Sequence, residues 1–267
     1  MKRIMLRVAY DGTEYCGWQR QPNGITVEGV LNHKLSALLK EEIEVVGASR
    51  TDAGVHARGN VCVFDTNSRI PGEKFAHALN PLLPGDITVQ ESSEVAADFH
   101  PRYCAINKTY EYWIYNATFP DPLLRRYTHF LYRPLDVAAM QQAAGYLIGE
   151  HDFKSFCSVN TQVKETVRKV NILEVLEEGV APFGGGVAKI SDRPRLITIR
   201  INGNGFLYNM VRIIAGTLIE VGYHRRGQES LVGTLAACDR QAAGATAPAC
   251  GLTLVGIQYN GALKEGS

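Results

Sequence analysis

The chain has 267 residues, enough for one large or two ordinary domains, and 45% of them are hydrophobic while 21% are charged. This composition is typical of a soluble globular protein, and no run of about 18 apolar residues is present that would cross a membrane. The formal net charge is only +1. A nucleic-acid-binding function would therefore need a local basic patch, because the chain as a whole is not a polycation.

The first residues and the cysteines bear on the cellular compartment. Arg7 and Asp11 interrupt the apolar stretch that a secretory signal would need, so we expect a cytoplasmic protein. The 6 cysteines are widely spaced and include no Cys-x-x-Cys pair, and no two histidines have the spacing of metal ligands. We therefore expect free thiols and no metal site.

The first half of the chain alternates predicted strands and helices. Alternating apolar residues predict a strand at 2–10, and a helical period predicts a helix at 27–40 with Thr26 as its N-cap. Two strands, a short helix ended by Pro81 and a last strand follow; their predicted ranges are 43–48, 59–65, 73–80 and 87–93. This order of elements is that of a ferredoxin-like unit.

The second half repeats this order loosely. Its predicted strands are 105–116, 167–177, 195–202 and 252–259, and its predicted helices are 137–149, 206–221 and 228–238, the first with Asp136 as N-cap. The glycine-rich segment 183–186 is interpreted as a hairpin loop. The sequence thus predicts an α+β fold with two ferredoxin-like lobes, residues 1–104 and 105–267. Their sheets would be antiparallel, with an active-site cleft between the lobes.

The most informative segment is 47–57, which reads GASRTDAGVHA. Gly54 allows a tight turn that projects Asp52 outward, and the small Ala53 leaves room for a flat substrate. Arg50 favours the ionised form of the nearby Asp52, which makes this carboxylate a candidate nucleophile or base. On its own, however, an Asp-x-Gly segment is most often only a structural turn.

The full segment resembles the signature of the tRNA pseudouridine synthase A family, in which the Asp is the catalytic residue. This resemblance implies that Asp52 is catalytic. Two further segments resemble motifs of the same family, 108–113 (KTYEYW) and 205–212 (GFLYNMVR). They imply that Tyr110 contacts the target uracil and that Arg212 pairs with the catalytic carboxylate.

Tyr110 and Arg212 also have purely structural interpretations. A tyrosine on a strand usually packs in the core or across strands, although its ring also suits stacking on a base, worth about 1–3 kcal/mol. Arg212 lies near the edge of the apolar face of its predicted helix. The alternative there is an arginine that extends its charged end into solvent.

Three more segments contribute to the predicted RNA-contacting surface. The loop 11–21 mixes aromatic, amide and basic groups that suit a nucleic acid, the alternative being a packed loop with a buried Trp18. This loop, 99–103 and 251–255 resemble segments of the same family, and the last of them implies leucines that line the active site. The predicted substrate-binding residues are Tyr110, Arg20, Arg58, Arg102 and Leu254. Further candidates for a basic patch are Arg125, Arg126, Arg225 and Arg226.

The resemblance implies an isomerase that converts uridine to pseudouridine at positions 38, 39 and 40 of the tRNA anticodon stem-loop, with Asp52 as nucleophile. It implies no cofactor, and it implies a homodimer whose two subunits bind one tRNA. Two alternatives stay open. A non-catalytic RNA-binding protein would leave Asp52 without a role, and a hydrolase with Asp52 as nucleophile would usually need a metal or a second catalytic acid.

Overall fold

The computed structural model describes residues 1–159, 165–179 and 194–260 of the chain. They form a mixed α/β fold whose strands pair mostly antiparallel, with a minority of parallel pairs. The chain divides into two compact units, Thr109–Leu252 and Met1–Lys108 with the segment from Thr253. The last strand therefore groups with the N-terminal residues, whereas the sequence-based division placed it in the second lobe. The predicted hairpin loop at 183–186 lies outside the described residues.

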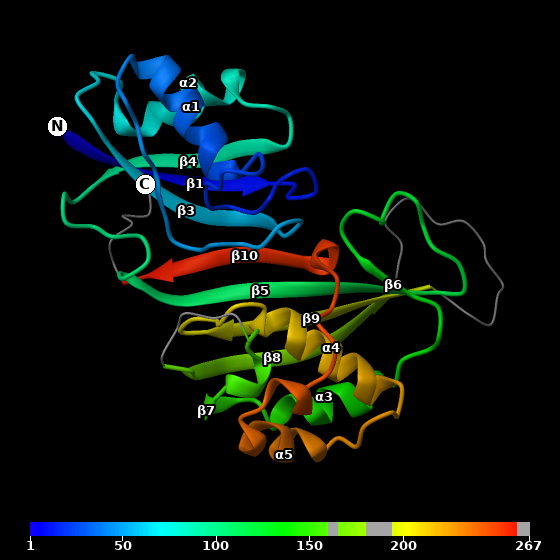
Figure 1. Cartoon of the computed structure of the whole chain (residues 1–267). Helices are drawn as coiled ribbons and strands as arrows, with labels where there is room; N and C mark the ends of the chain where they lie inside the picture. Colours follow the sequence, from blue (N-terminus) through cyan, green and yellow to red (C-terminus); the bar gives the residue numbers. More distant parts are fainter. Residues whose placement is uncertain (160–164, 180–193, 261–267) are drawn as a thin grey trace. The chain divides into compact units, whose positions relative to one another are not determined.

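The first unit consists of a sheet with two helices. Its elements are β1 (Lys2–Tyr10), α1 (Val27–Leu39), β2 (Val46–Gly47), β3 (His56–Thr66), α2 (Phe75–Leu79), β4 (Ile87–Val95) and β10 (Leu252–Tyr259). The strand order is β4-β1-β3-β10, and β2 pairs with a later part of β3. All these pairs are antiparallel except β3 with β10. Helix α1 packs against α2, and α2 against β4 (Figure 1).

Local signals in the sequence explain where α1 begins and ends. The Thr26 hydroxyl accepts a hydrogen bond from the Gly29 amide at 3.2 Å, so the predicted N-cap is confirmed. At the other end Lys40 has a φ of 58°, a left-handed conformation that commonly terminates a helix. The predicted helix at 27–40 thus matches the observed α1.

The predicted helix at 73–80 is divided into shorter pieces. A 3₁₀ turn, Gly72–Lys74, precedes α2, and a second one, Asn80–Leu82, follows it. Pro81 lies in the second turn, where it cannot donate the hydrogen bond that would continue an α-helix. The proline signal was therefore correct, whereas the length of the helix was overestimated.

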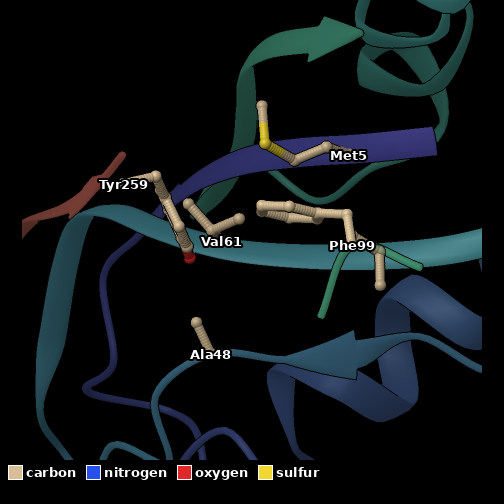
Figure 2. Packing of buried hydrophobic residues seen from close by; sticks show 6 residues of the cluster. Met5, Ala48, Val61, Phe99 and Tyr259 are labelled. Carbon is tan, nitrogen blue, oxygen red and sulfur yellow. The ribbon is translucent and has the colours of Figure 1, made fainter. Parts of the chain in front are cut away.

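A cluster of buried side chains joins distant segments of the first unit (Figure 2). Met5 of β1 and Val61 of β3 form part of it, together with Ala48, Phe99 and Tyr259. The Phe99 and Tyr259 rings are 5.2 Å apart at an angle of 57°. This packing fixes the segment that follows β2 and the segment around Phe99 against the same strands.

The second unit contains a sheet of order β5-β9-β8-β7, and β6 pairs with β5 in parallel. Its strands are β5 (Ala105–Asn116), which belongs to this unit from Thr109 onward, β6 (His129–Leu131), β7 (Gly149–Asp152), β8 (Val167–Gly179) and β9 (Arg195–Gly203). Its helices are α3 (Val137–Gly145), α4 (Met210–Gly222) and α5 (Ser230–Ala237), with 3₁₀ turns at Lys154–Phe156, Arg240–Ala242 and Ala249–Gly251. Helix α3 packs against both α4 and β8.

Two helices of this unit differ from their predicted ranges. The N-cap Asp136 is confirmed, because its carboxylate accepts from the Ala139 amide at 2.9 Å, but α3 ends at Gly145 and the residues from Gly149 begin β7. Helix α4 begins at Met210 rather than at 206, because Asn209 before it has a φ of 61° and cannot be part of a right-handed helix.

Helix α4 forms the centre of the second core. Met210, Ile213 and Ile214 are almost completely buried, as the apolar face of the predicted helix indicated, and Leu218 is buried as well. Gly216 is required at a close approach, since a Cβ there would lie 1.8 Å from the Ala245 carbonyl oxygen. None of the helices in the described ranges has the length and apolarity of a membrane span.

Candidate active site

Asp52 lies on the loop that connects β2 to β3. Its side chain is half-buried, and the neighbouring Ala53 is exposed, so the carboxylate is not sealed in the protein interior. Gly54 has a φ of 76°, the left-handed conformation that the turn requires and that glycine adopts without strain. The Val55 amide donates to the Asp52 carbonyl at 3.1 Å and closes the turn. The predicted tight turn that presents Asp52 is therefore confirmed.

A buried hydrogen-bond network holds the residues that precede Asp52. The Tyr10 hydroxyl lies 2.7 Å from the Thr51 hydroxyl. The Asn60 amide nitrogen donates to Tyr10 Oη at 3.3 Å and to the Ser49 carbonyl at 3.0 Å, and Asn60 Oδ1 accepts from the Ser49 amide at 3.3 Å. Tyr10 and Asn60 belong to adjacent strands, so the rigid sheet sets the backbone position beside Asp52.

The early loop 11–24 supports the Asp52 loop through its backbone. The Trp18 amide donates to the Thr51 carbonyl at 3.0 Å, and the Gly54 amide donates to the Tyr15 carbonyl at 3.3 Å. Gly17 has a φ of 86°, and a Cβ there would lie 2.5 Å from the Thr51 carbonyl oxygen. Trp18 is 1% exposed, with its ring 5.9 Å from that of Tyr10. The packed-loop interpretation of this segment is thus correct for Trp18.

His56 has a structural position at the start of β3. Its ring is 4% exposed, and its Nδ1 accepts a hydrogen bond from the Gly12 amide at 3.0 Å. The Asp11 carboxylate lies 3.2 Å from the same nitrogen. His56 fixes the start of the early loop relative to β3.

Strand β10 brings a residue from the far end of the sequence to this region. It pairs in parallel with β3, so that Thr253 lies opposite His56 and Leu254 lies opposite Ala57. Leu254 is fully buried. The structure thus places the predicted leucine beside the strand that continues directly from the Asp52 loop.

The predicted arginines of the first unit differ in their surroundings. Arg20, Arg50 and Arg58 are exposed, while Arg102 is half-buried and donates to the Gly47 carbonyl at 3.4 Å. In the described part of the chain, no hydrogen bond or ion pair joins Arg50 to another residue. Burial, and to a smaller extent the nearby Arg50, lower the pKa of Arg102.

Lys108 is a residue of this region that sequence reasoning missed. Its Nζ donates to the Ala48 carbonyl at 2.8 Å. Burial, with a smaller effect from Arg102, lowers the pKa of Lys108 to about 8. The only sequence signal was its place two residues before Tyr110, and nothing in that spacing predicts a contact with residue 48.

Tyr110 and Arg212 belong to the second unit. Tyr110 is 8% exposed and meets the Phe206 ring edge-on, with centroids 5.3 Å apart. Arg212 is half-buried; its Nε donates to the Ala247 carbonyl at 2.8 Å and its Nη1 to Asn209 Oδ1 at 2.8 Å. Arg212 therefore holds the segment that leads towards β10, rather than extending freely into solvent.

Other predicted features are distributed over the described residues. Arg226 of the expected basic patch has a structural role, since it forms an ion pair with Glu220 at 3.1 Å and donates to the Ala242 carbonyl at 2.8 Å.

All 6 cysteines are free thiols. Within residues 1–159, 165–179 and 194–260, no three His, Cys, Asp or Glu side chains gather as metal ligands would.

The site thus combines a half-buried aspartate on a braced loop with arginines on the same segments. A sequence model of the tRNA pseudouridine synthase family matches residues 7–104 and 143–260. These ranges include Asp52 and Arg212, whereas Tyr110 falls between them.

Curated relatives cover almost the whole chain. A protein of Ruminiclostridium cellulolyticum is 47% identical over 97% of this chain and 100% of its own length. Proteins of Brevibacillus brevis and Moorella thermoacetica are 48% and 47% identical with the same coverage. All three are named tRNA pseudouridine synthase A. The chain belongs to the tRNA pseudouridine synthase family, as the resemblance stated above indicated.

Proposed function

We propose that this chain converts uridine to pseudouridine at positions 38, 39 and 40 of the tRNA anticodon stem-loop, and that Asp52 starts the reaction. Family membership makes it a pseudouridine-forming isomerase, which disfavours the non-catalytic alternative. The single observation that carries the assignment to Asp52 is its half-buried carboxylate on a loop whose backbone is held from two sides. A carboxylate placed in this way loses little freedom when substrate binds.

The reaction cuts the bond between uracil and ribose, turns the base and rejoins it through carbon. An ionised Asp52 can begin this by attacking the sugar carbon, by attacking the base or by taking a ribose proton. All three routes need an anionic carboxylate that reaches the nucleotide. Uridine and pseudouridine have the same atoms and the same charge, so the reaction balances without a cofactor. The target uridine must first unstack from its neighbouring bases, which costs a few kcal/mol. Stacking on the protein and phosphate contacts contribute a similar favourable free energy.

Roles for the remaining site residues follow from this proposal. Arg50 and Arg212 would keep the carboxylate ionised and placed, since a neighbouring cation favours the charged form. Tyr110 would stack on or hold the flipped uracil, with Arg20, Arg58 and Arg102 contacting RNA and Leu254 lining the site. The half-buried position of Arg212 and the ordered ring of Tyr110 support these roles.

The finer architecture is part of the same proposal. The strand order β4-β1-β3, with β2 on the far side of β3, supports a ferredoxin-like first lobe. We infer a second such lobe, a substrate cleft between the two, a cytoplasmic location and a homodimer that binds one tRNA. A dimer would also supply positive surface that one nearly neutral chain lacks.

The proposed function can be tested on defined transcripts. The purified protein should form pseudouridine in a tRNA with uridines at positions 38 to 40 and none when all three are cytidine. Activity should persist in EDTA. Release of free uracil, or loss of activity in the chelator, would instead favour a metal-assisted hydrolase.

A further inference from the structure

We propose that Arg102 and Lys108, beside Arg50, together bind one backbone phosphate of the RNA substrate, with the exposed ring of Tyr103 stacking on an adjacent base. This inference rests on the proposed function, because it takes RNA as the ligand. It assigns a role to Lys108 and Tyr103, which the reaction at Asp52 leaves unused.

The geometry brings cations from two distant segments to one place. Lys108 Nζ donates to the Ala48 carbonyl at 2.8 Å, and Arg102 Nη2 donates to the carbonyl of the preceding residue, Gly47, at 3.4 Å. Arg50 follows two residues later on the same loop and lies close enough to affect the pKa of Arg102. Three positive side chains thus converge at the beginning of the Asp52 loop.

The core beneath these residues fixes their positions. Ala48, Phe99 and Tyr259 belong to one buried cluster (Figure 2). The Tyr259 hydroxyl donates to the Pro101 carbonyl at 2.8 Å. The segment that carries Arg102 is therefore held against the segment that carries Arg50, and the site is formed before any ligand binds.

The cluster has positive charge without a matching carboxylate. In the described part of the chain, no acidic side chain forms an ion pair or hydrogen bond with Arg50, Arg102 or Lys108. The side chains of Arg102 and Lys108 donate to backbone carbonyls. Glu28 of α1 is the acidic group that favours the charged form of Arg102, and it already accepts from the Arg20 amide at 2.6 Å. An anion stabilises positive side chains that lie close together, and a phosphate accepts hydrogen bonds from several donors at once.

The exposure of the side chains indicates an RNA strand rather than an isolated ion. Arg50 is exposed, Arg102 and Lys108 are half-buried, and Tyr103 beside them is 79% exposed. The Tyr103 ring lies over His100, with centroids 4.2 Å apart and an angle of 31°. A supported aromatic face next to cations fits a base and its phosphate in a single strand.

The test compares tRNA binding by four variants over a range of salt concentrations. Lys108→Gln and Arg102→Gln should each weaken binding by about tenfold and lower the slope of log K against log salt by about one, because one phosphate contact is lost. Lys108→Arg should retain most of the affinity and the full slope. Tyr103→Ala should weaken binding while leaving the slope unchanged, since stacking releases no counterion. Lys34→Gln on α1 is the matched control and should bind like the wild type.

Two results would overturn the phosphate site. If Lys108→Gln and Arg102→Gln keep the wild-type salt slope, the two side chains only support the loop. If 10 mM inorganic phosphate or uridine monophosphate raises the wild-type melting temperature as much as tRNA does, the cluster binds free anions rather than an RNA strand. Failure of the proposed reaction looks different: the wild-type protein would bind tRNA with the full salt slope and form no pseudouridine.

Discussion

The Asp52 loop and the cation cluster beside it, Arg50, Arg102 and Lys108, differ in how their polar groups are hydrogen-bonded. The backbone on either side of Asp52 is held by Tyr10, Asn60 and the early loop through buried hydrogen bonds. The side chains of Arg102 and Lys108 instead have only carbonyl partners within the described ranges. The first region uses buried hydrogen bonds to fix the backbone beside one carboxylate, while the second keeps positive charge available. This difference separates the positioning of a reactive group from the binding of a polyanion.

The largest expected effect on the braced region comes from Asn60→Ala. Asn60 is fully buried, and its side chain forms hydrogen bonds with both the amide and the carbonyl of Ser49. Removing this side chain therefore leaves two buried backbone groups unpaired. We expect a loss of about 3 kcal/mol in the free energy of unfolding, measured by urea denaturation, and a sharp fall in kcat. The exposed Asn67→Ala is the control and should change neither. An Asn60→Ala protein with wild-type stability would show that the network does not hold the loop.

A second substitution tests the backbone contact of the early loop. Gly17→Ala places a Cβ 2.5 Å from the Thr51 carbonyl at a φ of 86°. We expect destabilisation of about 2 kcal/mol, with reduced activity, because the loop must move away from Thr51. At Gly85 a Cβ meets nothing within 4 Å, so Gly85→Ala should be nearly neutral. Equal melting temperatures for the two variants would contradict this account.

A smaller effect is expected from Tyr10→Phe. The change removes one hydroxyl that contacts Thr51 and accepts from Asn60, while the ring keeps its packing against Trp18. Calorimetry should show a loss of about 1 kcal/mol, and kcat should fall more than the affinity for tRNA. If instead the affinity falls and kcat is unchanged, the hydroxyl acts in binding rather than in positioning.

The cation cluster should show a pH dependence that the braced region lacks. Lys108 has a pKa of about 8, which burial and the neighbouring Arg102 lower. Arg50 and Glu28 in turn affect the charge of Arg102. The charged form of Lys108 binds phosphate, so the affinity for tRNA should be full near pH 7 and fall severalfold as the pH rises through 8 to 9, while arginines stay protonated. Lys108→Arg should remove this decline. A decline that persists in Lys108→Arg would assign it to another group.

The strands, helices and caps that depend on residues close together in the chain could be predicted from the sequence. The strand at 2–10, the helix at 27–40 and its cap Thr26 are found because alternation, helical period and capping are local signals. The left-handed Asn209 shortened α4, and no local pattern marks such a residue in advance. Strand β7 at Gly149–Asp152 depends on pairing with β8 and was not predicted, and its first residue was placed at the end of a helix.

The candidate site was predicted unevenly for the same reason. Asp52 could be proposed from the sequence because its motif is contiguous. Asn60 and Lys108 were missed because their partners, Tyr10 and Ala48, lie 50 and 60 positions away along the chain. Contacts of that separation follow from strand register and core packing, which a single sequence does not display.

The most direct test of the central claim is a single-turnover assay with Asp52→Asn. The substitution keeps the size of the side chain and removes its negative charge. At saturating tRNA, the variant should bind with wild-type affinity and release no tritium from uracil-labelled tRNA, while Asp121→Asn in the second unit should behave like the wild type. Measurable pseudouridine formation by Asp52→Asn would contradict the assignment of this carboxylate as the group that starts the reaction.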